Sequence, residues 1–114
     1  MNNLRNKVQL IGNLGMNPEV KTTENGKKVA RFSLATSETY RNNEGKKVTE
    51  TQWHNIVVWG NLAGIAENYL QKGGEIALEG RLTHRQYEDK QGNKKFFTEI
   101  VANDFMMLRN KGQQ

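Results

Sequence analysis

Apolar and polar residues alternate along most of the chain, and this pattern predicts β-strands. The alternation, with its β-branched and aromatic residues, predicts strands at residues 4–12, 19–22, 28–36, 51–60, 75–87 and 94–108, of which 19–22 is short. Asn25-Gly26 is a strong hairpin signal between two of these strands. Residues 37–50 are polar and contain Gly45, so we expect a long hairpin loop there.

A different spacing appears after the strand at 51–60. Apolar residues recur at helical intervals over residues 62–71, which predicts one helix that Asn61 caps and Gly73 ends. Gly80 lies inside the strand at 75–87, where a glycine often indicates a bulge or a barrel bend.

One helix between the third and fourth long strands is the element order of the OB-fold, a five-stranded Greek-key barrel. We therefore predict an all-β fold, with one OB-fold domain over residues 1–108 and a short polar tail over residues 109–114. A length of 114 residues suits a single domain. An α+β sandwich fits the same element order.

Alternation along a strand also assigns side chains to faces. In the strand at 51–60, one face carries Trp53, Asn55, Val57 and Trp59, and the opposite face carries Gln52, His54, Ile56 and Val58. In the strand at 75–87, an apolar set of Ile76, Leu78 and Leu82 opposes Glu79, Arg81, Thr83, Arg85 and Tyr87. Cations for phosphates and flat rings for bases are what a single strand of nucleic acid requires.

The aromatic residues divide into core and surface candidates. We expect Phe32 in the core and Tyr69 packed under the helix, whereas Tyr40 and Tyr87 have polar and cationic neighbours that favour exposure and binding. A tryptophan in a strand is more often a core residue, so that alternative stays open for Trp53 and Trp59. The cations that we expect to contact phosphates are Arg41, Lys46, Lys47, Arg81, Arg85 and Lys90.

Composition supports a polyanionic partner. The formal net charge is +5 and the isoelectric point is about 9.6, which favours nucleic acid first and an acidic membrane surface second. Hydrophobic residues make up only 35% of the chain, so we expect a thin core and some burial of apolar surface by self-association. The absence of cysteine excludes disulfides and thiolate chemistry. The N-terminal residues do not resemble a signal peptide, and no apolar run is long enough to span a membrane.

No pattern of catalytic residues stands out. The chain has two histidines, His54 and His84, and it lacks the glycine spacing of a phosphate-binding loop. We therefore expect no catalytic residue, no metal site and no cofactor. A metal-dependent nuclease, an OB-fold protein-interaction module and an RNA-binding module are the alternatives.

The chain resembles the bacterial single-stranded-DNA-binding protein family over residues 4–108. The segments that carry the resemblance are Asn6-Lys7-Val8, GNLGMNPEV at 12–20, FSLATSETYR at 32–41, TQWHNIVVWG at 51–60, LAGIAENYLQKG at 62–73 and LEGRLTHRQYEDKQGNKKFFTEIVA at 78–102. They occur in the family's order and at its spacings, and their number makes the resemblance specific.

This resemblance implies an OB-fold that binds single-stranded DNA without sequence preference in replication, recombination and repair. It places the base-stacking rings at Tyr40, Trp53, Trp59 and Tyr87, and two of these family positions are commonly tryptophan where this chain has tyrosine. It also implies a homotetramer with His54, Lys7 and Val8 at its interface, in the cytoplasm of a bacterium and associated with the nucleoid.

The resemblance also raises an expectation about the C-terminus. Family members usually continue to an acidic tip that recruits repair and replication proteins. Residues 109–114 carry no such tip, so we do not expect tail-dependent partners.

Overall fold

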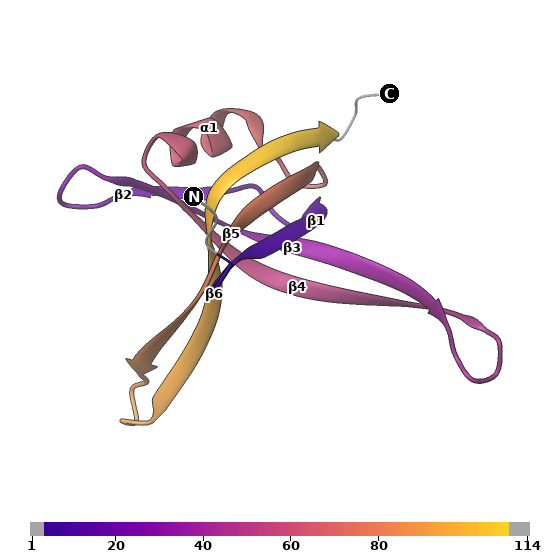
Figure 1. Ribbon diagram of the computed structural model, residues 1–114. Helices are drawn as coiled ribbons and strands as arrows, with labels where there is room; N and C mark the ends of the chain where they lie inside the picture. The colour runs from indigo at the N-terminus through magenta and orange to yellow at the C-terminus, as the bar shows by residue number, and fades with distance from the viewer. Residues whose placement is uncertain (1–3, 110–114) are drawn as a thin grey trace.

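The computed structural model describes residues 4–109, which form one curled sheet with a short helix beside it (Figure 1). The elements are β1 Val8–Leu14, β2 Glu19–Thr22, β3 Lys28–Arg41, β4 Lys47–Trp59, α1 Asn61–Tyr69, β5 Glu75–Glu88 and β6 Lys94–Arg109. The predicted tail, apart from Arg109, lies outside the described residues.

The sheet closes into a barrel. Its strands follow the order β1-β5-β6-β4-β3, and a further pairing of β1 with β3 closes the ring. β1 and β2 lie one after the other along β3, because β1 pairs with Leu34 and Ala35 while β2 pairs with residues 28–31. Five strands thus form the barrel, and α1 follows the third long one, as the OB-fold prediction requires.

Two glycines allow the strands to approach closely where the barrel bends. A Cβ atom on Gly12 would collide with the carbonyl oxygen of Ala35, and one on Gly80 would collide with that of Val101. Opposite Gly80 the register with β6 shifts, since Glu79 pairs with Asp104 but Gly80 pairs with Ala102. The bulge predicted at Gly80 is therefore confirmed, and the extra residue lies on the partner strand.

Alternate side chains of the strands fill the barrel. The buried cluster consists of Leu14, Ala30, Phe32, Leu34, Ile56, Val58, Ala63, Ala66, Leu70, Ile76, Leu78, Ile100 and Ala102. The prediction for Phe32 is confirmed. Leu82 was predicted to belong to the apolar set and instead lies exposed, because it comes after Gly80 where β5 leaves the barrel.

The helix differs from its prediction in three respects. The N-cap residue is Gly60, with φ near 69°, and no side chain caps the helix, so Asn61 is its first residue. The helix ends at Tyr69, before the turn in which Gly73 adopts a positive φ of 88°. Its buried side chains are small alanines at 63 and 66, whereas Tyr69 is 58% exposed, because the helix meets the barrel along a narrow face.

The expected loop at 37–50 is mostly strand. β3 and β4 remain paired as far as Arg41 and Lys47, and the turn is only residues 42–46. Hydroxyl pairs hold this extension, with Ser37 bonded to Thr51 and Thr39 bonded to Thr49. No apolar alternation is needed for such pairing, which is why the polar sequence indicated a loop.

The two long hairpins project from the barrel as arms (Figure 1). We call residues 37–51 the β3–β4 arm and residues 83–98 the β5–β6 arm. The molecule is elongated as a result, with extents of 54, 42 and 34 Å along its principal axes. β4 and β6 pair only at Ile56–Ile100 and Val57–Val101, so the two arms diverge from a common origin.

Candidate nucleic-acid interface

Strand pairing joins one set of side chains into a single surface outside the barrel. Val57 pairs with Arg31 on β3 and with Val101 on β6, and Val101 in turn pairs with Arg81 on β5. Directly paired residues project to the same side of a sheet. This surface, here called the outer face, comprises Arg31, Ser33, Trp53, Asn55, Val57, Trp59, Arg81, Thr83, Arg85, Tyr87, Phe97, Glu99 and Val101.

Both tryptophans are surface residues of this face. Trp53 is 62% exposed and Trp59 is 42% exposed, so the alternative that they belong to the core is wrong. The Trp53 ring rests against Gly15, where an added Cβ would collide with the ring and approach Ser33 Oγ to 2.8 Å. Gly15 therefore provides a flat support that holds the Trp53 ring in place.

A second aromatic group lies on the β5–β6 arm. Tyr87 is 53% exposed, and the Cζ atom of Arg85 lies 5.8 Å from the centroid of the Phe97 ring. These three residues and Gln86 line a shallow hollow of about 360 Å³. A cation stacked on one ring beside a second exposed ring can receive a base together with its phosphate.

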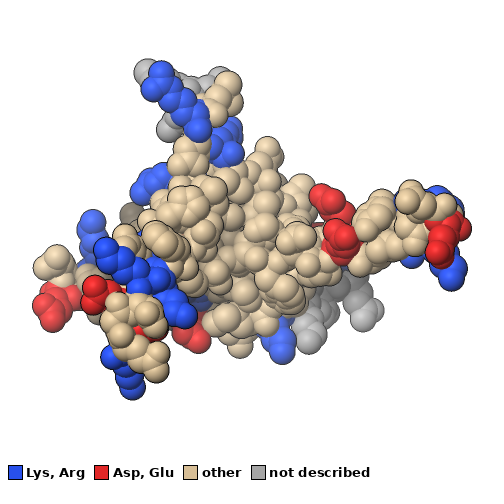
Figure 2. All heavy atoms as spheres, turned by 90° about the horizontal axis from the view of Figure 1, so that it is seen from below, with Lys and Arg blue, Asp and Glu red and all other residues tan. Residues whose placement is uncertain are grey.

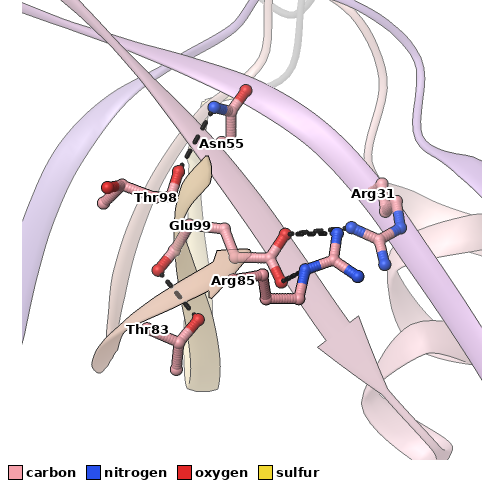
Figure 3. A network of polar contacts seen from close by, with 6 residues as sticks. All are labelled: Arg31, Asn55, Thr83, Arg85, Thr98 and Glu99. Carbon is pink, nitrogen blue, oxygen red and sulfur yellow. Dashed lines mark hydrogen bonds and ion pairs between the residues drawn. The ribbon is translucent and has the colours of Figure 1, made fainter. Parts of the chain in front are cut away.

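The outer face also contains a buried carboxylate, which two arginines approach (Figure 3). Glu99 on β6 is only 5% exposed, and its Oε2 atom accepts a hydrogen bond of 3.0 Å from Arg31 Nη1. Arg85 approaches the same carboxylate with Nε 3.0 Å from Oε1 and Nη2 3.4 Å from Oε2. We call Arg31, Glu99 and Arg85 the guanidinium–carboxylate cluster.

Neighbouring groups fix the strand that carries this carboxylate (Figure 3). Thr83 Oγ1 donates to the backbone oxygen of Glu99 at 3.2 Å, and Asn55 Nδ2 donates to the backbone oxygen of Thr98 at 3.4 Å. The second bond links β4 to β6 where the arms begin to diverge. The cluster thus lies where the β5–β6 arm leaves the barrel, and these two hydrogen bonds hold the backbone of β6 in place there.

The remaining predicted phosphate contacts lie around this face. Arg81 is exposed beside Val101, while Lys46 and Lys90 lie in the turns at the arm tips. Arg41 and Lys47 pair across the last rung of the β3–β4 arm, and Arg41 Nη1 donates to the Gly45 carbonyl at 3.0 Å. Figure 2 shows basic side chains on the projecting parts of the molecule, with acidic side chains among them, and a largely uncharged body between these parts.

Tyr40 does not share the face of the tryptophans. It lies in β3, not in a loop, and by alternation it projects with its partner Val48 to the opposite side of the ladder. Its hydroxyl donates a 2.8 Å hydrogen bond to Glu50 Oε1. This bond, the negative charge of Glu50 and partial burial raise the pKa of Tyr40 above its usual value.

The predicted oligomer residues are not members of the outer face as defined above. His54 is partly buried opposite Leu34, and its Nε2 atom lies 3.0 Å from Thr36 Oγ1, which confirms that it faces away from Trp53 and Trp59. Lys7 forms an ion pair of 3.4 Å with Glu79. Val8 packs partly against the core. Their contact with a second subunit stays a prediction.

Three aromatic or charged residues of the outer face were not assigned to the site by sequence reasoning. Arg31, Phe97 and Glu99 come from strands whose mutual register the sequence does not reveal. In the strand predicted at residues 28–36, alternation puts Arg31 on the side opposite Ala30, Phe32 and Leu34, and that was the one available signal. Within residues 4–109, no group of three or more metal-ligating side chains occurs, and no helix is long and apolar enough to cross a membrane.

Comparison with known proteins identifies relatives along nearly the whole chain. Residues 5–108 match the Single-strand binding protein family. The chain is 49% identical over 107 residues to single-stranded DNA-binding protein 1 of Chlorobaculum tepidum, covering 93% of this chain and 66% of that protein. It is 47% identical over 108 residues to the single-stranded DNA-binding protein of Neisseria meningitidis serogroup A, and the match covers 95% of this chain and 62% of that protein. The chain thus spans about two thirds or less of the length of these relatives.

Solved structures share the same architecture. A Plasmodium falciparum SSB in complex with single-stranded DNA superimposes with a TM-score of 0.84 at 38% identity, covering 95% of this chain and 99% of that one. A variant of the single-stranded DNA binding protein from Thermus aquaticus gives a TM-score of 0.82 at 30% identity, and the match covers 95% of this chain and 52% of that one. The sequence match, the barrel and these likenesses agree: the chain belongs to the Single-strand binding protein family.

Proposed function

We propose that this protein binds and protects single-stranded DNA without sequence preference, in replication, recombination and repair. The observation that carries the proposal is the outer face, where exposed rings of Trp53, Trp59 and Tyr87 share one side of the sheet with arginines of β3 and β5. Unpaired bases stack on such rings whatever their identity, and the cations bind the backbone. The relatives named as single-stranded DNA-binding proteins support the same ligand.

The spacing of the rings indicates how the strand is held. Trp53 and Trp59 are six residues apart on β4, which is roughly 20 Å at about 3.3 Å per residue. One base cannot contact both rings, so each ring takes its own base. Tyr87 beside Phe97 and Arg85 provides a further platform on the β5–β6 arm.

The arms extend the path of the strand. Arg41, Lys46 and Lys47 supply cations along the β3–β4 arm, and Lys90 supplies one at the tip of the other arm. Tyr40 lies on the far side of its ladder, so it meets DNA that passes around the arm. Arg81 contacts the phosphates that lie beside the barrel.

Self-association completes the proposal. Large apolar side chains outside the outer face remain exposed in the single chain, among them Ile11, Phe96 and Met106. We propose that they are buried in a homotetramer, with His54, Lys7 and Val8 at or near its interface. The bacterial relatives support action in the cytoplasm on nucleoid DNA.

Titration with poly(dT), followed by tryptophan fluorescence and combined with light scattering, tests binding and assembly in one sample. We expect strong quenching and the mass of four subunits. Unchanged fluorescence with no bound DNA would overturn the binding proposal, and a monomeric mass at micromolar concentration would overturn the tetramer.

The same assay separates the alternatives. Equal or tighter binding of poly(U) would favour an RNA ligand. Cleavage of labelled DNA by the pure protein with Mg²⁺ would reveal a nuclease, whereas we propose binding without covalent chemistry.

A further inference from the structure

The guanidinium–carboxylate cluster is an unusual feature of a surface that receives phosphates. Glu99 is nearly buried in the middle of the outer face and contacts two cations from β3 and β5, strands that are not neighbours in the sheet. A carboxylate at this point repels a phosphate that approaches either arginine. It also reduces the charge of the cluster from two positive charges to one.

The contacts leave both guanidinium groups able to bind a second anion. They use one N–H of Arg31 and two of Arg85, out of the five that each guanidinium carries. Both arginine side chains are partly exposed, at 39% and 54%, whereas the carboxylate side chain is 6% exposed. Glu99 is therefore the buried member of the cluster, while both arginine side chains keep surface that a second anion can reach.

We propose that Glu99 sets the charge and position of this arginine pair for DNA, an inference that rests on the proposed function. The buried carboxylate holds the two guanidinium groups beside the rings and lets the pair neutralise one phosphate instead of two. Stacking then supplies a larger share of the binding, and the complex tolerates salt better than a surface with two free arginines.

The salt dependence of binding to short oligo(dT) tests this role. On a single strand, log K falls with log salt by about 0.7 for each phosphate neutralised. Glu99→Gln keeps the size of the side chain and removes its charge. We expect tighter binding at low salt and a slope steeper by about 0.7 per engaged subunit, which is about fivefold more loss per tenfold rise in salt.

A double variant that removes one positive and one negative charge of the cluster gives a more specific test, again through the salt dependence of binding. Arg31→Gln leaves the cluster neutral, so its slope should be shallower than wild type by about 0.7. Arg31→Gln/Glu99→Gln returns the cluster to one positive charge and should restore the wild-type slope. Should Glu99→Gln alone fail to fold, the double variant must still be steeper by about 0.7 than Arg31→Gln.

Glu67→Gln is the matched control. Glu67 on α1 forms an exposed ion pair of 2.8 Å with Lys28 on β3. Its substitution by glutamine changes the net charge of the protein by the same amount as Glu99→Gln. Its slope should stay at the wild-type value. A slope of Glu99→Gln equal to wild type, or equal steepening in Glu67→Gln, would overturn the role of Glu99. Failure of the wild type to bind oligo(dT) would instead overturn the proposed function.

Discussion

The outer face and the β3–β4 arm both carry aromatic and basic side chains, but the structure supports them differently. On the outer face, Trp53 rests on Gly15 and Arg85 is held by a buried carboxylate. On the arm, Lys46 and Lys47 are exposed on a ladder held by hydroxyl pairs. Groups fixed before binding lose less conformational freedom when DNA arrives. The outer face should therefore dominate affinity, while the arm should act mainly through charge.

Removal of both tryptophans should produce the largest effect. Trp53→Ala/Trp59→Ala should weaken binding of oligo(dT) by about 1–3 kcal/mol for each ring that stacks on a base. The melting temperature should hardly change, because both rings lie outside the core. Fluorescence anisotropy of labelled DNA and thermal unfolding measure the two quantities. A collapse of the melting temperature would instead assign these rings to the folding core.

Single substitutions should distinguish a cation that contacts the buried carboxylate, Arg85, from an exposed cation of the arm, Lys47. Arg85→Ala removes two contacts to buried Glu99, so it should cost about 1.5–3 kcal/mol of unfolding free energy as well as DNA affinity. Lys47→Ala on the arm should flatten the salt slope by about 0.7 and leave stability unchanged. Chemical denaturation beside salt titration makes the comparison. Equal stability of the two variants would contradict the difference between the regions.

A smaller effect is expected from the support beneath Trp53. Gly15→Ala places a methyl group where the ring now lies, so the ring must tilt away. We expect a shift of the tryptophan emission in free protein and loss of part of the roughly 1–3 kcal/mol that one stacked base contributes. Gly64→Ala in α1 is the control, because a methyl group there would meet no atom within 4 Å. Unchanged emission and affinity in Gly15→Ala would mean that the ring position does not matter.

The smallest effect concerns the arm and pH. The pKa of Tyr40 is raised in the folded protein, so its bond to Glu50 supports the arm fully below the unfolded pKa of about 10. This support is lost as the pH rises through the higher folded pKa. Amide exchange in residues 37–51 should therefore increase at high pH in wild type more than in Tyr40→Phe, which has no hydroxyl to titrate. The same pH response in both proteins would exclude Tyr40 as the cause.

Much of the fold followed from local pattern. Period-two alternation located the long strands, the bulge at Gly80 followed from a glycine inside a strand, and parity put Trp53 and Trp59 on one face. These inferences succeed because backbone geometry alone sets the alternation of side chains. The resemblance to a family supplied the partner and the rings that we propose to stack on bases.

Other features depended on pairing between distant strands. The sequence of the β3–β4 arm is polar, and only its cross-strand hydroxyl bonds reveal it as strand. Tyr40 was expected in an exposed loop, yet the uninterrupted ladder places it in β3 with its side chain on the side opposite the tryptophans.

The sequence by itself determined the strand segments of the barrel, the helix, the basic charge and the pair of tryptophans on one face, since each follows from neighbours along the chain. Only the tertiary structure decided that Arg31, Glu99 and Arg85 meet, because they come from three strands whose register depends on barrel closure. The closure itself depends on how closely Gly12 and Gly80 let the backbones approach. Nothing in the local pattern around Glu99 distinguishes it from an exposed acid, and the two arginines that contact its carboxylate lie 14 and 68 positions away in the chain.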